Sequence, residues 1–386
     1  MEQEFSISKG WKIFGYVFSG AIICIMLYFL GDAITSGENI PLWIVLNIIT
    51  IALFGYMIIS MYKSKIVLTS DQITQYGAFS QKRLIFDQVK GIRITQKGGI
   101  VIESDYPGQP KITIGDLSYT KNSSQLSEFL TGKFKNLDDI EYNAELTEAL
   151  HDPTIGTSVE DREQRLADVK KITRILNIGG VIVTFWLFIY PNPYLLAVVA
   201  GLIYPLVALI YFFKQQEVIM LVETKKKSAY PSLTFAIIFP PMGLGIRVLI
   251  QYALLYPKDF IVPAGVLFIV LGLIFLLFTR ASKNKNTNLL AGIVFSLMYS
   301  AGAIVMVNCA FDRSVPAEYK TKVLDQRISS GKSTTYYLTL DGWGPRKEQE
   351  DESVPHSVYN QVKKGDVVTV YLKRGYLHIP WYFVDL

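Results

Sequence analysis

The residues best placed to do chemistry are one arginine and three polar side chains that interrupt apolar stretches. Arg247 and Gln251 are four residues apart in the apolar run 230–256 and would share a helix face. If that run crosses a membrane, its cation costs about 3 kcal/mol at the centre, so Arg247 should face protein, water or the interface. Asn308 and Asp312, also four apart, end the last apolar run at a similar expected depth. We therefore expect an ion pair between Arg247 and Asp312, completed by hydrogen bonds from the two amides. The alternative is that Arg247 snorkels outward between lipid headgroups.

Histidine and cysteine do not form a catalytic or metal-binding pattern. His151 lies in a polar linker, and His356 and His378 lie near the C-terminus without metal-ligand spacing. Cys24 and Cys309 lie in different apolar runs. Neither a Gly-x-Ser-x-Gly motif nor a glycine-rich phosphate loop between a strand and a helix occurs. The sequence therefore predicts a non-enzymatic protein that needs no metal ion and no cofactor.

Composition and long apolar runs place the chain in a membrane. Of its 386 residues, 50% are hydrophobic and 18% are charged, whereas soluble proteins average about 25% charged residues. A bilayer core about 30 Å thick takes about twenty helical residues. The longest uncharged stretch, 175–213, is interrupted by Tyr190-Pro191-Asn192-Pro193 and so divides into two spans. Seven spans are predicted in all: 13–31, 40–62, two within 175–213, 230–256, 260–279 and 287–311.

Basic residues beside these runs set the expected orientation. They form three groups that should lie at the membrane surface: Lys63 and Lys65; Lys170, Lys171 and Arg174; Lys225, Lys226 and Lys227. By the positive-inside bias these groups are cytoplasmic, as is the N-terminus, and an odd number of spans then puts the C-terminus outside. The net charge of +5 is spread over such groups and forms no single stripe, so the lipid bilayer, and not nucleic acid, is the expected partner.

Two segments outside the spans have the two-residue period of β-structure. Residues 65–114 contain short strands separated by Gly, Asp, Ser and Pro turns, and an amphipathic helix follows from Asn122 to Phe134. The tail 312–386 has further strands, and a small five-stranded barrel of OB or SH3 type is expected there. The last strand contains Pro380 and should therefore lie at an edge.

These observations divide the chain into five parts. Residues 1–62 are a transmembrane hairpin, 63–137 a cytoplasmic β-domain, and 138–174 a linker with a juxtamembrane helix. A five-span region over 175–311 and an extracytoplasmic β-domain over 312–386 complete the chain. The predicted fold class is thus an α-helical integral membrane protein of about seven spans with two small β-rich domains.

Two resemblances support this architecture. The phrases 67–73 (VLTSDQI) and 86–93 (FDQVKGIR), with the closing helix, make residues 65–135 resemble a bacterial pleckstrin-homology-like (PH-like) domain. That resemblance implies a partly open barrel plugged by the helix. The segments 243–247 (GLGIR), 308–312 (NCAFD), 342–344 (GWG), 358–366 (VYNQVKKGD) and 379–382 (IPWY) are similar to uncharacterised bacterial multi-pass membrane proteins. Because that group has no established activity, it implies architecture only.

Two functions are compatible with these patterns. The favoured hypothesis is a scaffold or accessory protein of the bacterial cytoplasmic membrane, whose β-domains bind other envelope proteins or a second copy of the chain. The alternative is a small-solute transporter or channel, because the Pro240-Pro241 pair predicts a kink or break in the span 230–256 and broken helices line transport paths.

Overall fold

The computed structural model describes residues 2–37, 40–95, 98–223, 225–279, 282, 284–330 and 334–385. The chain forms two compact units. Unit 1 comprises Met1–Thr147 with Lys225–Ala229, and unit 2 comprises Glu148–Thr224 with Tyr230–Leu386. Seven helices of the described chain are long and apolar enough to cross a membrane, which confirms the expected number: Lys9–Ser36, Ile40–Lys63, Val159–Ile189, Tyr194–Lys214, Thr234–Gln251, Pro257–Phe278 and Lys285–Ala310.

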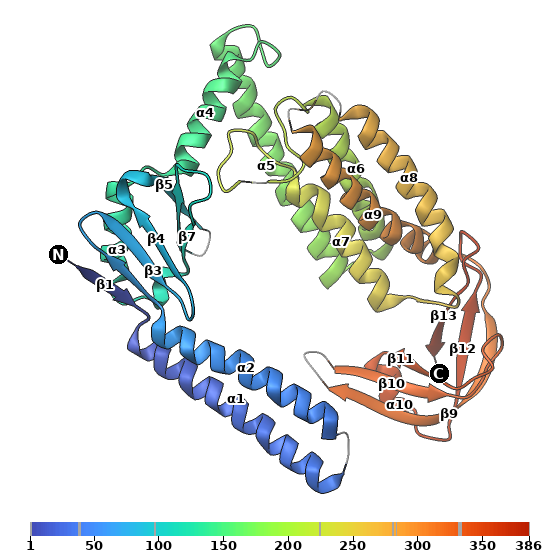
Figure 1. Ribbon diagram of the computed structural model, residues 1–386. Coiled ribbons are helices and arrows are strands. Elements are labelled where there is room, and N and C mark those ends of the chain that lie inside the picture. Colours follow the sequence, from blue (N-terminus) through green and yellow to red (C-terminus); the bar gives the residue numbers. More distant parts are fainter. Residues whose placement is uncertain are drawn as a thin grey trace. The chain divides into compact units, whose positions relative to one another are not determined.

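Unit 1 begins with an antiparallel helical hairpin, α1 (Lys9–Ser36) and α2 (Ile40–Lys63), drawn in blue in Figure 1. The Met61 side chain of α2 packs directly on Gly15 of α1, where a Cβ would lie 2.1 Å from the Met61 sulfur. The buried Asn47 side chain donates from Nδ2 to the Met26 carbonyl at 3.0 Å, which ties α2 to α1. Only 11% and 6% of the most apolar windows of α1 and α2 are buried. Apolar side chains therefore face outward around the hairpin, as lipid-facing helices require.

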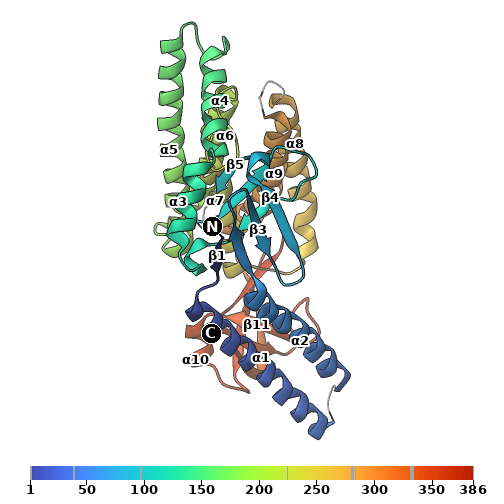
Figure 2. The ribbon, with the colours of Figure 1, turned by 60° about the vertical axis from the view of Figure 1, so that its left-hand side comes forward.

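The N-terminal β-module continues from this hairpin (Figure 2). One sheet has the order β1-β2-β3-β4, a second has the order β5-β6-β7, and helix α3 shares their apolar core through Leu126 and Leu130. The elements are β1 (Gln3–Ser6), β2 (Lys65–Leu68), β3 (Gln72–Tyr76), β4 (Gln81–Ile85), β5 (Val89–Ile94), β6 (Ile100–Ser104), β7 (Ile112–Ile114) and α3 (Ser123–Lys133).

Strand β1 extends this module beyond the expected start at residue 63. It pairs antiparallel with β2, with Gln3 opposite Leu68, so the chain enters and leaves the helical hairpin from the same sheet. Both ends of the hairpin are consequently fixed to one β-module. Helix α4 (Leu137–His151) follows where a linker was expected.

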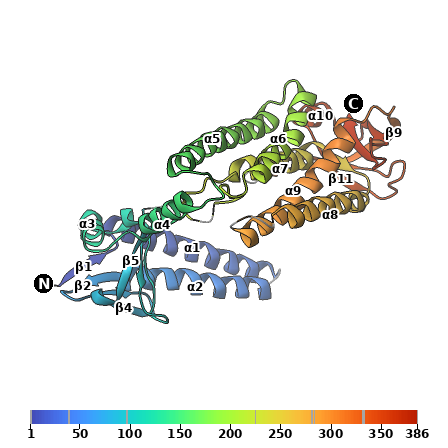
Figure 3. The same ribbon diagram turned by 90° about the horizontal axis from the view of Figure 1, so that it is seen from above.

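Unit 2 contains five apolar helices that lie side by side in Figure 3: α5 (Val159–Ile189), α6 (Tyr194–Lys214), α7 (Thr234–Gln251), α8 (Ile261–Phe278) and α9 (Lys285–Ala310). Helix α5 combines the expected juxtamembrane helix and the third span without a break. Glycines allow close packing, because a Cβ at Gly180 would lie 2.7 Å from the Ala236 Cα and one at Gly292 would lie 2.4 Å from the Phe275 ring. Helix α9 is the most enclosed, with half of its apolar window buried.

The span 230–256, in which the sequence predicted a kink or a break, is not broken. Helix α7 runs continuously from Thr234 to Gln251 with Pro240 and Pro241 inside it, and eighteen residues are about 27 Å long. Asn177 of α5 fixes its start, since its side-chain oxygen accepts from the backbone N–H groups of Phe235 at 3.1 Å and Ala236 at 3.0 Å. The helix therefore continues past the prolines and retains a length that can cross an apolar layer.

The C-terminal β-module is a six-stranded sheet of order β11-β10-β9-β12-β13-β8, with helix α10 (His356–Gln361). Its strands are β8 (Ala253–Leu254), β9 (Ala317–Ser330), β10 (Thr334–Leu340), β11 (Glu350–Val354), β12 (Val367–Lys373) and β13 (Trp381–Asp385). The prediction that the last strand lies at an edge is wrong, because β8 pairs with β13 on its outer side. Pro380 precedes β13, and its carbonyl accepts from the Leu255 N–H at 2.9 Å. The strand β8, between α7 and α8, fastens the sheet to the helices.

Candidate functional site

Asn308 is the centre of the polar cluster that ends α9. Its side chain is fully buried, and the oxygen accepts from the N–H groups of Leu377 at 2.9 Å and Ile379 at 3.3 Å. The Nδ2 group donates to the Ile379 carbonyl at 2.8 Å, and the Asn308 carbonyl accepts from the Tyr376 N–H at 2.8 Å. One side chain therefore shapes the turn that leads from β12 to β13.

Gly375 is required at this turn for two reasons. Its φ is +79°, a conformation that favours glycine, and a Cβ there would lie 2.3 Å from the Ile379 carbonyl oxygen and 2.4 Å from the Asn308 side-chain oxygen. The backbone thus approaches Asn308 more closely than any other residue would allow. Asparagine and glycine together fix the C-terminal module on the helix end.

Asp312 lies beside this turn and is also fully engaged. Its carboxylate, whose side chain is 2% exposed, accepts from the N–H groups of Ser314 at 2.7 Å and Gly375 at 3.0 Å and from the Trp381 indole at 2.8 Å. The Lys373 ammonium lies 4.0 Å from it. Burial acts to raise the pKa of the Asp312 carboxyl, but the hydrogen bonds from Ser314, Trp381 and Gly375 outweigh it, so the pKa is lower than usual. The group is a buried carboxylate that organises the tail.

The ion pair expected between Arg247 and Asp312 is not formed, and that expectation is wrong. The Arg247 Nε donates to Gln251 at 2.7 Å, which confirms that these two residues share a face. The guanidinium carbon lies 5.8 Å from the centre of the Tyr194 ring. Asn308 and Asp312 are indeed brought together, but by the tail and not by Arg247. Helical spacing correctly predicted that Arg247 and Gln251 share a face. The partners of Asn308 and Asp312, however, are residues 373–381, which are far away in the sequence.

A series of aromatic contacts links Arg247 to Asp312. The Tyr194 hydroxyl is hydrogen bonded to that of Tyr252 at 2.5 Å, and the Tyr252 ring meets the Trp381 ring edge to face at 5.3 Å. These contacts join α6, the end of α7 and β13. These aromatic side chains therefore connect the helices to the C-terminal sheet. The sequence did not predict this contact, because single aromatic residues in apolar runs carry no distinguishing signal.

The lysines 225–227 bind the acidic side of α4 in unit 1. Lys225 pairs with Glu145 at 2.8 Å, Lys227 pairs with Asp139 at 2.5 Å, and Lys226 donates to the carbonyl of Ile94 at 2.8 Å. Ser228 donates to Glu145 at 2.7 Å and the Ala229 N–H donates to the same carboxylate at 3.1 Å. We call Lys225–Ala229 the lysine loop. Its charges serve this contact, whereas the sequence predicted a membrane-surface role.

The α4 carboxylates also bind Arg93 of β5, which contacts Asp138 at 2.7 Å and pairs with Glu141. Burial acts to raise the pKa of Glu145, but hydrogen bonds from Lys225, Ser228 and Ala229 outweigh it and lower the pKa. The hydrogen bond from Arg93 lowers the pKa of Glu141. Both groups are therefore held ionised beside the lysine loop.

The other predicted surface cations divide into two kinds. Lys65 pairs with Glu4 of β1 at 2.9 Å, and the Lys63 ammonium lies 5.5 Å from the centre of the Phe79 ring. By contrast, Lys170, Lys171 and Arg174 are exposed on α5 and make no ion pair with any other described residue. These three side chains keep the charge available for an anionic surface.

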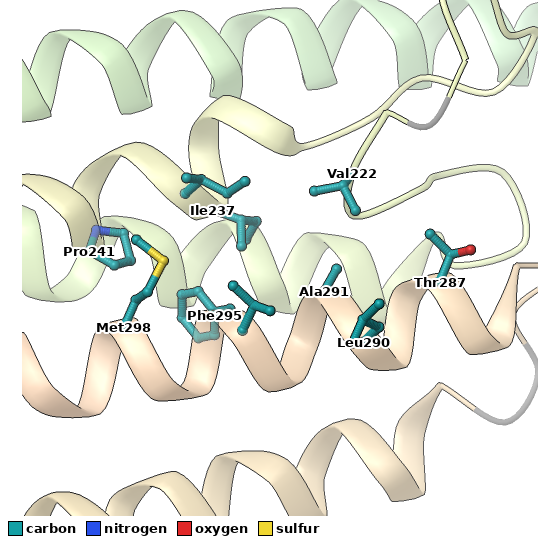
Figure 4. A pocket seen from close by; sticks show the side chains of 10 residues that line it. Val222, Ile237, Pro241, Thr287, Leu290, Ala291, Phe295 and Met298 are labelled. Atoms are coloured by element: carbon teal, nitrogen blue, oxygen red, sulfur yellow. The ribbon is translucent and has the colours of Figure 1, made fainter. Parts of the chain in front are cut away.

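An apolar cavity of about 310 Å³ lies between α7 and α9 (Figure 4). Its lining residues come from both helices and from the segment before the lysine loop: Val222, Ile237, Ile238, Pro241, Thr287, Leu290, Ala291, Val294, Phe295 and Met298. Within the described residues, histidine, cysteine and carboxylate side chains form no group that could hold a metal ion. Comparison with family models, with curated proteins and with solved structures found no match to the chain.

Proposed function

We propose that the protein is a non-enzymatic scaffold or accessory protein of a bacterial cytoplasmic membrane, with seven spans and a β-module at each membrane face. Its β-modules would bind other envelope proteins or a second copy of the chain. The observation that carries this proposal is that each β-module is attached to apolar helices at more than one point of the chain. Strands β1 and β2 flank the α1–α2 hairpin, and β8 joins the tail sheet to the connection between α7 and α8.

Such attachment suits a protein that presents surfaces. A module held by a single linker would reorient freely, whereas two chain connections restrict it. The polar side chains Asn308 and Asp312, the first candidates for catalysis or transport, are instead hydrogen bonded by the tail. These hydrogen bonds hold the C-terminal module on the end of α9.

The orientation belongs to the same proposal. In unit 2, Asn288 near the start of α9 accepts from the Leu221 N–H at 2.9 Å, while the end of α9 binds the tail. The loop 215–223 and the C-terminal module thus lie at opposite ends of these helices. With the cations 170, 171 and 174 on the loop's side, the positive-inside bias puts the loop in the cytoplasm and the tail outside.

We propose that the N-terminal module is a PH-like domain and that the C-terminal module is a small barrel of OB or SH3 type. Two sheets that share a core with α3 are compatible with a PH-like domain, and a six-stranded sheet with one short helix is compatible with a small barrel of OB or SH3 type. The transporter alternative depended on a broken helix. Because α7 is continuous, that alternative keeps only the cavity beside α7 in its favour.

In-cell photo-crosslinking tests the scaffold function. A photoreactive residue at Val367 would lie on the tail module, where that side chain is 61% exposed, and one at Gln109 would lie on the N-terminal module. The matched control is Val262, 74% exposed on the apolar helix α8. We expect discrete protein adducts at position 367 or 109 and lipid adducts alone at position 262. Protein adducts at neither module would refute the function.

A further inference from the structure

Phe79 is an apolar side chain that the N-terminal β-module exposes at the tip of a tight turn. The turn joins β3 to β4 and is closed by the Gly77 N–H, which donates to the Ser80 carbonyl at 2.8 Å. Ala78 is 4% exposed and fixes the turn on the module, whereas Phe79 is 75% exposed. A ring that is mostly exposed to water forgoes the free energy gained by burying apolar surface. The ring is therefore available to an apolar partner outside the module.

The register of the sheet places this turn beside the end of helix α2. Tyr76 of β3 lies opposite Lys65 of β2, and Lys65 follows closely after α2 ends at Lys63. The centre of the Phe79 ring lies 6.1 Å from that of the Tyr56 ring and 5.5 Å from the Lys63 ammonium. Tyr56 precedes Lys63 by about two helical turns, or about 10 Å along the axis. Phe79 therefore lies beside both the apolar part of α2 and its terminal cation.

The same end of the hairpin carries the aromatic side chains that mark a membrane–water interface. Trp11 of α1 and Tyr62 of α2 are 42% and 75% exposed, and these two residue types are enriched where a span meets the lipid headgroups. The Trp11 ring also meets the ring of Tyr119, which belongs to the module, edge to face at 4.6 Å. The β3–β4 turn and the segment around Tyr119 thus both contact the hairpin at the level where it would leave the membrane.

We propose that the N-terminal module binds the phospholipid leaflet that its own hairpin enters, with Phe79 inserted at the boundary between headgroups and acyl chains. The leaflet is selected as the occupant because Phe79 continues the outward-facing apolar surface of α2, where Tyr56 is 54% exposed. The Lys63 ammonium beside the ring suits the headgroup phosphates. Side chains that bind at an interface in this way reach about 5–10 Å into it. The inference rests on the membrane location proposed above, but not on the scaffold function.

Quenchers carried by the lipid measure whether the turn reaches the leaflet. A fluorescent NBD label is attached at Ser80→Cys in the full-length chain with Cys24→Ala, since the remaining Cys309 is buried. The protein is reconstituted in phosphatidylcholine–phosphatidylglycerol vesicles that contain a lipid with a doxyl quencher near the headgroup end of its acyl chain. The matched control is Ser70→Cys, because Ser70 is exposed in the β2–β3 turn at the opposite end of β3.

We expect about threefold stronger quenching at position 80 than at position 70, because β3 separates the two turns by about 15 Å, which is more than the depth of an interfacial contact. Equal quenching at the two positions would overturn the proposal. Phe79→Ser in the Ser80→Cys protein should reduce the quenching about twofold or more, since the inserted apolar group is lost. Ile85→Ser, at a side chain 40% exposed at the far end of β4, should not change it. Unchanged quenching in Phe79→Ser would refute the role of the ring, and this substitution leaves the core of the module intact because Phe79 is exposed.

A label at Ile59→Cys separates this inference from the membrane location on which it rests. Ile59 is 37% exposed on α2, between Tyr56 and Lys63, and the quencher should reach it if the hairpin spans the bilayer. Quenching at position 59 without stronger quenching at position 80 than at 70 would refute the binding of the module and leave the membrane location standing. Absence of quenching at position 59 would refute the membrane location and this inference with it.

Discussion

Replacing Asn308 by alanine tests how the C-terminal module is held. The substitution removes hydrogen bonds to the Leu377 N–H and to both backbone groups of Ile379, at distances of 2.9, 3.3 and 2.8 Å. Each buried group left without a partner costs about 1–3 kcal/mol. The bond at 3.3 Å is the weakest, so two well-formed bonds set the estimate at about 3 kcal/mol, which corresponds to about 100-fold in an equilibrium constant.

Hydrogen exchange of residues 376–379 in detergent-solubilised protein measures this effect. We expect about 100-fold faster exchange in Asn308→Ala, because local opening of the turn becomes easier. The matched control is Ser300→Ala on the same helix, where the buried hydroxyl donates only to carbonyls of its own helix, those of Ser296 at 2.6 Å and Leu297 at 3.3 Å. That variant should change exchange of the turn by less than about threefold, since the lost bond is local. Equal exchange in Asn308→Ala and wild type would refute the role given to Asn308.

Three further predictions follow from the same contacts. Gly375→Ala should loosen the turn at least as much as loss of the Asn308 side chain, because its Cβ has no room at φ +79°; unchanged exchange of 376–379 would contradict this. The pKa of Glu145 is lower than the usual glutamate value of 4.5. Ionised Glu145 therefore stabilises the lysine loop fully at pH values above 4.5, and this stabilisation is lost as the pH falls through the lowered pKa. Hydrogen exchange of 225–229, corrected for intrinsic rates, should therefore accelerate on acidification in wild type but be accelerated already at pH 7 in Glu145→Gln, and identical profiles would disprove the contact. Arg247→Ala should lower the free energy of unfolding by about 1 kcal/mol or less, since it removes one exposed amide contact and one ring contact; a loss of several kcal/mol in thermal unfolding would indicate a buried ion pair after all.

The helical half of the fold was predictable because its signal is local. Apolar runs of about twenty residues need no partner to be recognised, and all seven expected spans correspond to helices. The segment 65–114 was predicted to contain short strands because apolar residues recur in it with a period of two, and strands β2 to β7 lie there. Strand β1 was missed because four residues before an apolar run show no period, and β8 was missed because it has two residues. Both strands exist through pairing with residues distant in sequence.

The candidate site was predictable in its members but not in its partners. Asn308 and Asp312 were recognised because polar side chains at the end of an apolar run must be satisfied somewhere. Helical spacing relates residues on one helix and says nothing about which distant segment approaches it. The partners in the tail are backbone N–H groups, which have no sequence signature. The Gly375 N–H donates to Asp312, and the Leu377 N–H donates to Asn308. Arg247, the partner expected for Asp312, is therefore not needed. For the same reason the lysine loop was read as a surface charge, although its carboxylate partners on α4 were visible in the sequence.

Side-specific cysteine labelling in intact cells and in inverted membrane vesicles tests the central claim that the two β-modules lie on opposite sides of one membrane. Reporters at Gln109→Cys and Ser357→Cys occupy exposed positions of the N-terminal and C-terminal modules, and the wild-type chain, with Cys24 in α1 and Cys309 buried in α9, gives the background. With a membrane-impermeant maleimide, we predict that position 357 is labelled in intact cells and position 109 only in inverted vesicles. Labelling of both positions from the same side would contradict seven crossings and the proposed function that depends on them.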